Sequence, residues 1–272
     1  MPFLKLRDLS ICYHAVGRGE ALILIPGFAS GAWSWFRQTK ELSKDFRVVT
    51  FDPHGIGKSR ARGGETDLKN LSMRTFVEDI LRLLDFLKTE KAHIVGASFG
   101  GFVAQEFALR FPERLNKLIL ACTTAGGANH VKPSIEVLRS FAPDASLSPG
   151  EHIRRFLRPA FTDEFNRQHA DEIERICQMR EANEVAEAVY LAQLQTAFGF
   201  DSGDKIGAIE TETLILTGDK DSVVPMENSL NLAGKLPNAT LKIIENGSHL
   251  FFIENADEFN RLVREFCQNR LQ

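Results

Sequence analysis

The sequence predicts an α/β fold in which a mostly parallel central sheet of about eight strands is flanked by helices. Short apolar runs alternate with longer segments of helical periodicity along most of the 272 residues. The apolar runs are continuous, as in strands that helices cover on both faces. Such an alternation with short connections is typical of a parallel sheet.

The expected elements follow from these patterns in chain order. Residues 3–7 and 11–16 are close enough in the chain to form an antiparallel hairpin at one edge of the sheet. Helices are expected at 73–87, 99–111 and 255–266, and the first shows apolar side chains every three or four residues. The remaining strands are expected at 22–25, 47–51, 93–95, 118–120, 214–216 and 241–244.

A long segment, residues 123–204, interrupts the alternation. It contains helical patterns and several prolines but no convincing strand. About eighty residues without a strand exceed an ordinary crossover connection. We therefore expect a helical cap inserted after the sixth strand, with residues 1–122 and 205–272 forming the core. The alternative is a set of long crossover helices that cover no site.

Charge and cysteine spacing exclude several classes of protein. With 33 Lys and Arg against 36 Asp and Glu, the net charge of −3 gives no electrostatic reason to bind nucleic acid or an anionic membrane. The four cysteines lie far apart, so no zinc ribbon or dithiol motif is indicated, and we expect buried free thiols. No signal peptide or membrane-spanning run is visible. The expectation is a cytoplasmic monomer or homodimer with no metal and no other cofactor.

The sharpest motif is G-A-S-F-G-G at residues 96–101. Ser98 stands between glycines, directly after a predicted strand and directly before a predicted helix. In this context G-x-S-x-G describes a nucleophile elbow, a strained turn that lifts the serine Oγ above the sheet. The helix N-terminus beside it favours developing negative charge. The alternative is a glycine-rich turn with an incidental serine.

A serine hydroxyl needs a base, and the base needs an orienting carboxylate. Among seven histidines, His249 is the candidate base because it follows the last predicted strand in a loop before the final helix. The other histidines lie in strands, in the cap among charged residues, or in the loop after 47–51. Two aspartates, Asp219 and Asp221, follow the strand 214–216, and Asp219 has the alternative task of stabilising its own turn.

With the order serine, aspartate, histidine, the chain resembles the α/β-hydrolase superfamily in its branch of small capped esterases and lactonases. The resemblance covers residues 1–122 and 205–272. In the family pattern G-x-x-D selects Asp221, and the implied oxyanion donors are the backbone N–H groups of Phe28 and Phe99. Pro26 and His54 replace a histidine and an arginine of many relatives. The matching motifs are I-P-G-F at 25–28, D-P-H-G-I-G-K-S at 52–59, G-A-S-F-G-G at 96–101, G-D-K-D at 218–221 and G-S-H at 247–249.

This resemblance implies a serine hydrolase that cleaves carboxylic esters of small hydrophobic acyl or aromatic substrates through an acyl-enzyme. With 21 Phe against 2 Tyr, the pocket is expected to be aromatic with few hydroxyl donors. Cationic contacts for a dianionic lactone are available from Arg154, Arg155 and Arg158 in the cap. The expected substrate contacts are Trp33, Phe141, Phe156, Phe161 and Leu250.

Other reactions on the same triad stay open. They are lactone hydrolysis of the 3-oxoadipate enol-lactonase type, cofactor-free haloperoxidase activity and carbon–carbon bond hydrolysis. Hydrolases of meta-cleavage products usually have Asn before the serine and Trp after the histidine, where this chain has Ala97 and Leu250. A lyase, or a receptor that binds a ligand without turnover, is a further alternative. The expected partner is a small-molecule ester or lactone.

Overall fold

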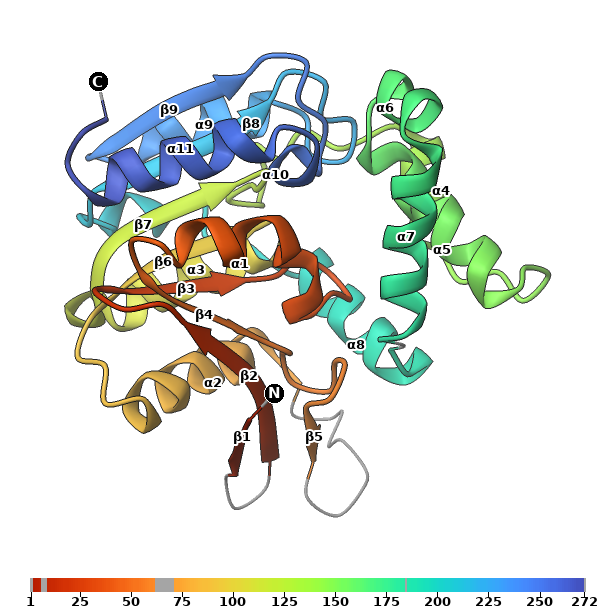
Figure 1. Ribbon diagram of the computed structural model, residues 1–272. Coiled ribbons are helices and arrows are strands. Elements are labelled where there is room, and N and C mark those ends of the chain that lie inside the picture. The colour runs from red at the N-terminus through yellow and green to blue at the C-terminus, as the bar shows by residue number, and fades with distance from the viewer. Residues whose placement is uncertain (1, 6–8, 62–70, 184, 272) are drawn as a thin grey trace.

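The computed structural model describes residues 2–5, 9–61, 71–183 and 185–271, and it confirms the predicted α/β class (Figure 1). Nine strands of the described part form one sheet, eight of them in the order β1-β2-β4-β3-β6-β7-β8-β9, while β5 pairs with β2. The neighbours from β4 to β9 are parallel, and β2 is antiparallel to β1, β4 and β5. The bounds are β1 Phe3–Lys5, β2 Leu9–Val16, β3 Ala21–Ile25, β4 Arg47–Phe51, β5 Arg60–Ala61, β6 Ala92–Ala97, β7 Leu115–Ala121, β8 Thr213–Gly218 and β9 Ala239–Ile244.

The two N-terminal strands form the predicted hairpin, in which Phe3 pairs with Cys12 and Lys5 with Ser10. Residues 6 and 7, which the prediction included in the first strand, lie outside the described residues. The sequence did not predict β5, because a pairing of two residues is too short to produce a hydrophobic pattern. With β5 counted, β7 is the seventh strand in chain order rather than the sixth.

Helices cover both faces of the sheet, which explains the continuous apolar runs. In β3, Ile23 and Ile25 pack toward α2 and α3, whereas Leu22 and Leu24 pack toward α1 and α11. The predicted helices are confirmed to within one residue at each end. One face carries α2 Met73–Phe86, α3 Phe99–Arg110 and α9 Glu227–Lys235, and the other carries α1 Phe36–Leu42, α10 Phe251–Glu254 and α11 Ala256–Cys267.

The chain between β7 and β8 is helical, and we call residues 122–212 the helical insertion. Figure 1 shows its helices grouped at the end of the sheet toward which the parallel strands point. Local capping explains several starts: the hydroxyls of Ser134, Ser148 and Thr162 accept the backbone N–H groups of α4, α5 and α6, respectively. The helices are α4 Ile135–Phe141, α5 Pro149–Leu157, α6 Asp163–Gln168, α7 Ala170–Glu181 and α8 Glu187–Phe198.

The four cysteines, at positions 12, 122, 177 and 267, are buried free thiols, as predicted. Among the described residues, no helix combines the length and the hydropathy needed to cross a membrane.

Candidate active site

Ser98 occupies the turn between β6 and α3 with φ 53° and ψ −118°, a strained backbone conformation for a serine. Its N–H donates to the Ala121 carbonyl at 2.9 Å, and its carbonyl accepts the Thr123 hydroxyl at 2.8 Å. A Cβ on Gly96 would collide with the Gly100 carbonyl, and one on Gly100 would collide with Ile25. The two flanking glycines are therefore packing requirements of the elbow.

Asp221 and His249 meet at the carboxyl ends of β8 and β9. Asp221 Oδ2 lies 2.9 Å from His249 Nδ1, and both side chains are buried. Asp221 Oδ1 accepts the backbone N–H groups of Val223 and Val224 at 2.9 and 2.8 Å. Each oxygen of this carboxylate therefore has a separate task. Asp219, the other candidate, makes no hydrogen bond to His249.

The loop that carries His249 is attached to the helical insertion. The Leu250 N–H donates to the Ala160 carbonyl at 2.9 Å. Glu254 joins the same two regions, because its Oε2 accepts the Ser248 N–H at 3.2 Å and its Oε1 accepts the Thr162 hydroxyl at 2.6 Å. The orientation of the histidine therefore depends on contacts that the insertion supplies.

A cavity of about 60 Å³ lies beside the serine. Ser98 and His249 both line it, so the elbow and the histidine face one space. Four of the five predicted substrate contacts also line it: Trp33, Phe141, Phe156 and Leu250. Wall residues that the prediction missed include Ser30, Ile176, Arg180, Phe252 and Ile253.

Phe161 corrects the prediction, because it does not line this cavity. It stacks on Phe165 with ring centroids 5.1 Å apart and faces a larger outer groove of about 820 Å³. The backbone at Phe161 is extended (φ −119°, ψ 157°). Adjacent side chains in an extended backbone point in opposite directions, so Ala160 reaches the cavity and Phe161 does not.

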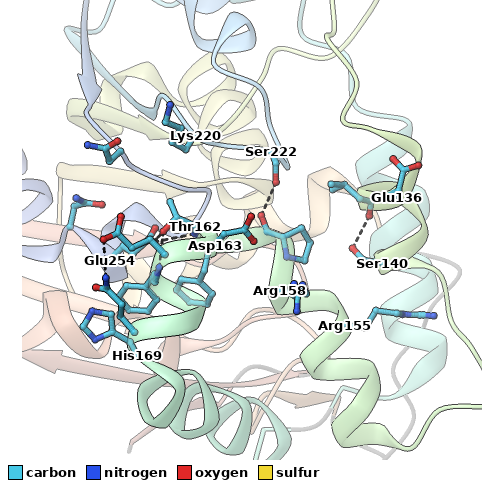
Figure 2. Close-up of a pocket in the computed structure, with 18 residues that line it drawn as sticks. Glu136, Ser140, Arg155, Arg158, Thr162, Asp163, His169, Lys220, Ser222 and Glu254 are labelled. Atoms are coloured by element: carbon cyan, nitrogen blue, oxygen red, sulfur yellow. Dashed lines mark hydrogen bonds between the residues drawn. The ribbon is translucent and has the colours of Figure 1, made fainter.

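The three arginines proposed as cationic contacts also lie outside the cavity. Arg154 pairs with Glu174 at 2.7 Å, and Arg155 pairs with Asp144 at 2.9 Å. Figure 2 shows Arg155 and Arg158 along the outer groove.

The cation in the cavity is Arg180 on α7, whose side chain is only 8% exposed. It forms no ion pair with any described residue and donates one hydrogen bond, to the Ser30 hydroxyl at 3.3 Å. Burial lowers the pKa of Arg180 to about 10, so the group is still charged at neutral pH. A sequence signal existed: Ile173, Ile176, Cys177 and Arg180 form one helical stripe, and an arginine in an apolar stripe is buried.

The turn that carries Phe28 passes directly beside Ser98. A Cβ placed on Gly27 would lie 3.4 Å from the Ser98 Cβ. The N–H groups of Phe28 and Phe99 donate to no other group in the described part of the chain. Two free donors near the serine are what an oxyanion site requires. Within the same ranges, no group of three or more His, Cys, Asp or Glu side chains is placed to hold a metal ion.

Comparison with known proteins identifies the family of the chain. The family described as alpha/beta hydrolase fold matches residues 20–256. The poly(3-hydroxyalkanoate) depolymerase of Ectopseudomonas oleovorans is 30% identical over 92% of this chain and 85% of its own length. The 2-hydroxy-6-oxo-6-phenylhexa-2,4-dienoate hydrolase of Comamonas testosteroni is 29% identical over 97% of this chain and 93% of its own.

A solved structure is similar along nearly the whole chain. It is a variant of the meta-cleavage product hydrolase from Pseudomonas fluorescens IP01, complexed with acetates, with a TM-score of 0.80 and 28% identity over 96% of this chain and 95% of that one. The relatives are hydrolases of different substrates. The chain is therefore a hydrolase that belongs to the alpha/beta hydrolase fold family.

Proposed function

We propose that the protein is a carboxylic-ester hydrolase that acts through an acyl-enzyme on Ser98. The observation that carries the proposal is the 2.9 Å contact between His249 Nδ1 and Asp221 Oδ2, at a cavity that Ser98 and His249 both line. A carboxylate on Nδ1 holds the tautomer in which Nε2 is free to accept the serine proton.

The reaction then has two halves. Ser98 Oγ attacks the ester carbonyl carbon while His249 takes the hydroxyl proton, and the N–H groups of Phe28 and Phe99 stabilise the oxyanion. His249 protonates the alcohol as the C–O bond breaks, which leaves the acyl group on Ser98. A water molecule, deprotonated by His249, attacks this acyl group, and the acid is released as Ser98 recovers its proton.

The cavity favours small, apolar acyl groups. Its polar lining is limited to Ser30, Ser34, Ser98, Arg180 and His249, and its other walls are mainly aromatic and aliphatic. The volume of about 60 Å³ is small for a ligand cavity, so a long acyl chain would have to displace the walls. Acyl groups of about two to four carbons are therefore expected to react faster than long chains.

The test is a series of p-nitrophenyl esters of rising chain length beside a few lactones, with Ser98→Ala as the blank. We expect kcat/KM to be largest for the short esters and to vanish in Ser98→Ala. Turnover of the lactones without turnover of any ester would replace this proposal by lactone hydrolysis.

A second candidate is hydrolysis of a carbon–carbon bond in a substrate that carries a carboxylate, and Arg180 favours it. A buried cation without an ionic partner is destabilising unless a ligand supplies the opposite charge. The relatives from Comamonas testosteroni and Pseudomonas fluorescens are named as hydrolases of this kind. Ala97 and Leu250, where such enzymes usually have Asn and Trp, argue against it.

The two candidates separate in one assay with 2-hydroxy-6-oxo-6-phenylhexa-2,4-dienoate. Carbon–carbon hydrolysis would release benzoate from this acid, with a kcat/KM above that of every neutral ester. Arg180→Met would then remove the dienoate reaction and keep the ester reaction. An absence of benzoate, with rapid turnover of short esters, would leave ester hydrolysis as the function.

A further inference from the structure

Residues 27–30 form a tight turn that carries Phe28, one of the two oxyanion donors in the proposed function. The Ser30 N–H donates to the Gly27 carbonyl at 3.3 Å, which closes the turn. Ala29 has φ 49°, a left-handed conformation that glycine or asparagine usually adopts at the third position of a turn. An alanine there is strained, so other contacts must hold the turn in this form.

Gln193 on α8 supplies such a contact from the helical insertion. Its Oε1 accepts the Ala29 N–H at 2.6 Å, and the side chain is fully buried. The carbonyl of the same Phe28–Ala29 peptide accepts the Ser30 hydroxyl at 3.2 Å. Both polar ends of this peptide are therefore held. Reversing the peptide would relieve Ala29 but would turn the Phe28 carbonyl toward the Gln193 oxygen, where the two oxygens repel.

Only the oxygen of the Gln193 side-chain amide forms a hydrogen bond among the described residues. Its Nε2 is buried and has no hydrogen-bond partner among the described residues. An unpaired buried N–H₂ group destabilises the fold, and an apolar side chain of the same size would avoid that cost. The hydrogen bond that Gln193 Oε1 accepts from the Ala29 N–H is thus the interaction that distinguishes glutamine from a simple packing residue here.

The same face of α8 also contacts the preceding residue of the turn. Tyr190, one helical turn before Gln193, packs edge-on against the Phe28 ring with centroids 4.7 Å apart. The helix therefore holds Phe28 by its ring and Ala29 by its N–H.

We propose that Gln193 is a positioning residue for the oxyanion site: it holds the 27–30 turn in the strained form that presents the Phe28 N–H beside Ser98. The proposal rests on the proposed function, because it assumes that Phe28 stabilises an oxyanion. An oxyanion donor acts mainly in the transition state, so its displacement lowers kcat and leaves KM nearly unchanged. Deleting one donor costs about 10²–10³ in kcat, and we expect a displaced donor to cost about 10–100-fold.

The test compares Gln193→Met with Gln195→Met. Methionine keeps the length of glutamine and removes the acceptor, and Gln195 is exposed on the same helix. We expect kcat for p-nitrophenyl butyrate to fall about 10–100-fold in Gln193→Met, with KM within about threefold, and to stay at the wild-type value in Gln195→Met. The melting temperature of Gln193→Met should stay close to that of the wild type, because removing the unpaired Nε2 offsets the loss of the acceptor for the buried Ala29 N–H.

A second variant tests the turn itself. Adding Ala29→Gly to Gln193→Met removes the strain of the left-handed residue, so part of the lost kcat should return, by about 3–10-fold. Loss of activity that Ala29→Gly does not restore, or a rise in KM in place of a fall in kcat, would overturn the proposal. So would a kcat in Gln193→Met within twofold of the wild type.

A fluorophosphonate probe separates this inference from the proposed function. Ser98 Oγ attacks phosphorus, fluoride leaves, and the proton passes to His249, so the labelling rate measured by intact mass needs no ester substrate. If labelling is about 10–100-fold slower in Gln193→Met, the positioning role is supported. This holds even if the protein hydrolyses none of the esters, a result that would overturn only the ester assignment. Equal labelling rates in the wild type and Gln193→Met would overturn the positioning role while esters are still turned over.

Discussion

The guanidinium of Arg180 lies over the ring of Phe156, 4.1 Å from the ring centroid, inside the cavity that Ser98 lines. The negative face of the ring offsets part of the cost of burying the cation. Ser30 is its one hydrogen-bond acceptor among the described residues, which leaves other guanidinium N–H groups for a ligand. The cavity therefore combines apolar walls with a single positive charge.

Ser98→Ala is expected to abolish ester hydrolysis without unfolding the protein, because one small hydroxyl contributes little to stability. Loss of a triad serine leaves the residual catalysis of the oxyanion site, so turnover should fall by about 10⁴ or more. Ester turnover and circular dichroism of the variant measure the loss of activity and the retained fold. The wild type assayed in EDTA is the control for adventitious metal. Wild-type turnover in Ser98→Ala would remove the nucleophile assignment.

The two aspartates after β8 should differ sharply. In Asp221→Asn, the oxygen can still accept from Val223 and Val224, but an N–H₂ group then faces His249 Nδ1 and favours the wrong tautomer. We expect kcat to fall by about 10³–10⁴ in this variant and by less than about tenfold in Asp219→Asn. A larger loss in Asp219→Asn would show that the wrong aspartate has been assigned to the histidine.

Arg180→Met should weaken the binding of esters that carry a carboxylate and should increase the stability of the fold. Burial lowers the pKa of Arg180 to about 10, so removing this charge should raise the free energy of unfolding by about 1–3 kcal/mol. The KM for monoethyl succinate should rise about 10–100-fold, while ethyl 4-methylpentanoate, its neutral isostere, should be unaffected. Urea unfolding and the two KM values measure both effects. An equal change for both esters would show that Arg180 acts through cavity shape.

Alkaline pH should produce the same loss of selectivity in the wild type. Arg180 loses its proton above its pKa of about 10, so the KM for monoethyl succinate should rise above that pH while that of the neutral ester does not. The pKa of Arg180 is lower in the folded protein than in the unfolded chain. Above pH 10 the unfolded chain therefore binds more protons at this group than the folded protein does. As a result, the contribution of Arg180 to the free energy of unfolding increases as pH rises through 10. If the KM for monoethyl succinate still rises above pH 10 in Arg180→Met, another group causes the effect.

Glu254 should be a stability determinant of the junction between the histidine loop and the helical insertion. Glu254→Ala leaves the N–H groups of Ser248 and Thr162 without their acceptor, which should cost about 1–3 kcal/mol of unfolding free energy. Glu258→Ala, on the exposed face of α11, is the matched control and should change stability by less than about 0.5 kcal/mol. Chemical denaturation of both variants tests the difference, and equal losses would contradict it.

Much of the fold and of the candidate site was predictable because the signals are local. The strand before Ser98, the glycines around it and the helix after it stand within a few residues, so the elbow is readable from the sequence. The continuous apolar strands followed from burial on both faces of the sheet. Asp221 and His249 each lie in the loop that follows a strand, and parallel strands bring their carboxyl ends to one edge.

The sequence by itself thus determined the α/β class, the order of the serine, aspartate and histidine along the chain, and four residues of the cavity wall. Only the tertiary structure decided that Phe161 turns away, that Arg180 and not the arginines at 154, 155 and 158 enters the cavity, and that Gln193 reaches Ala29. The physical reason is distance along the chain. Ala29 and Gln193 are separated by 164 residues. The apolar stripe of α7 indicates that Arg180 is buried, but the packing of α7 and α8 against the core, which no local pattern encodes, determines which cavity or turn a buried polar side chain reaches.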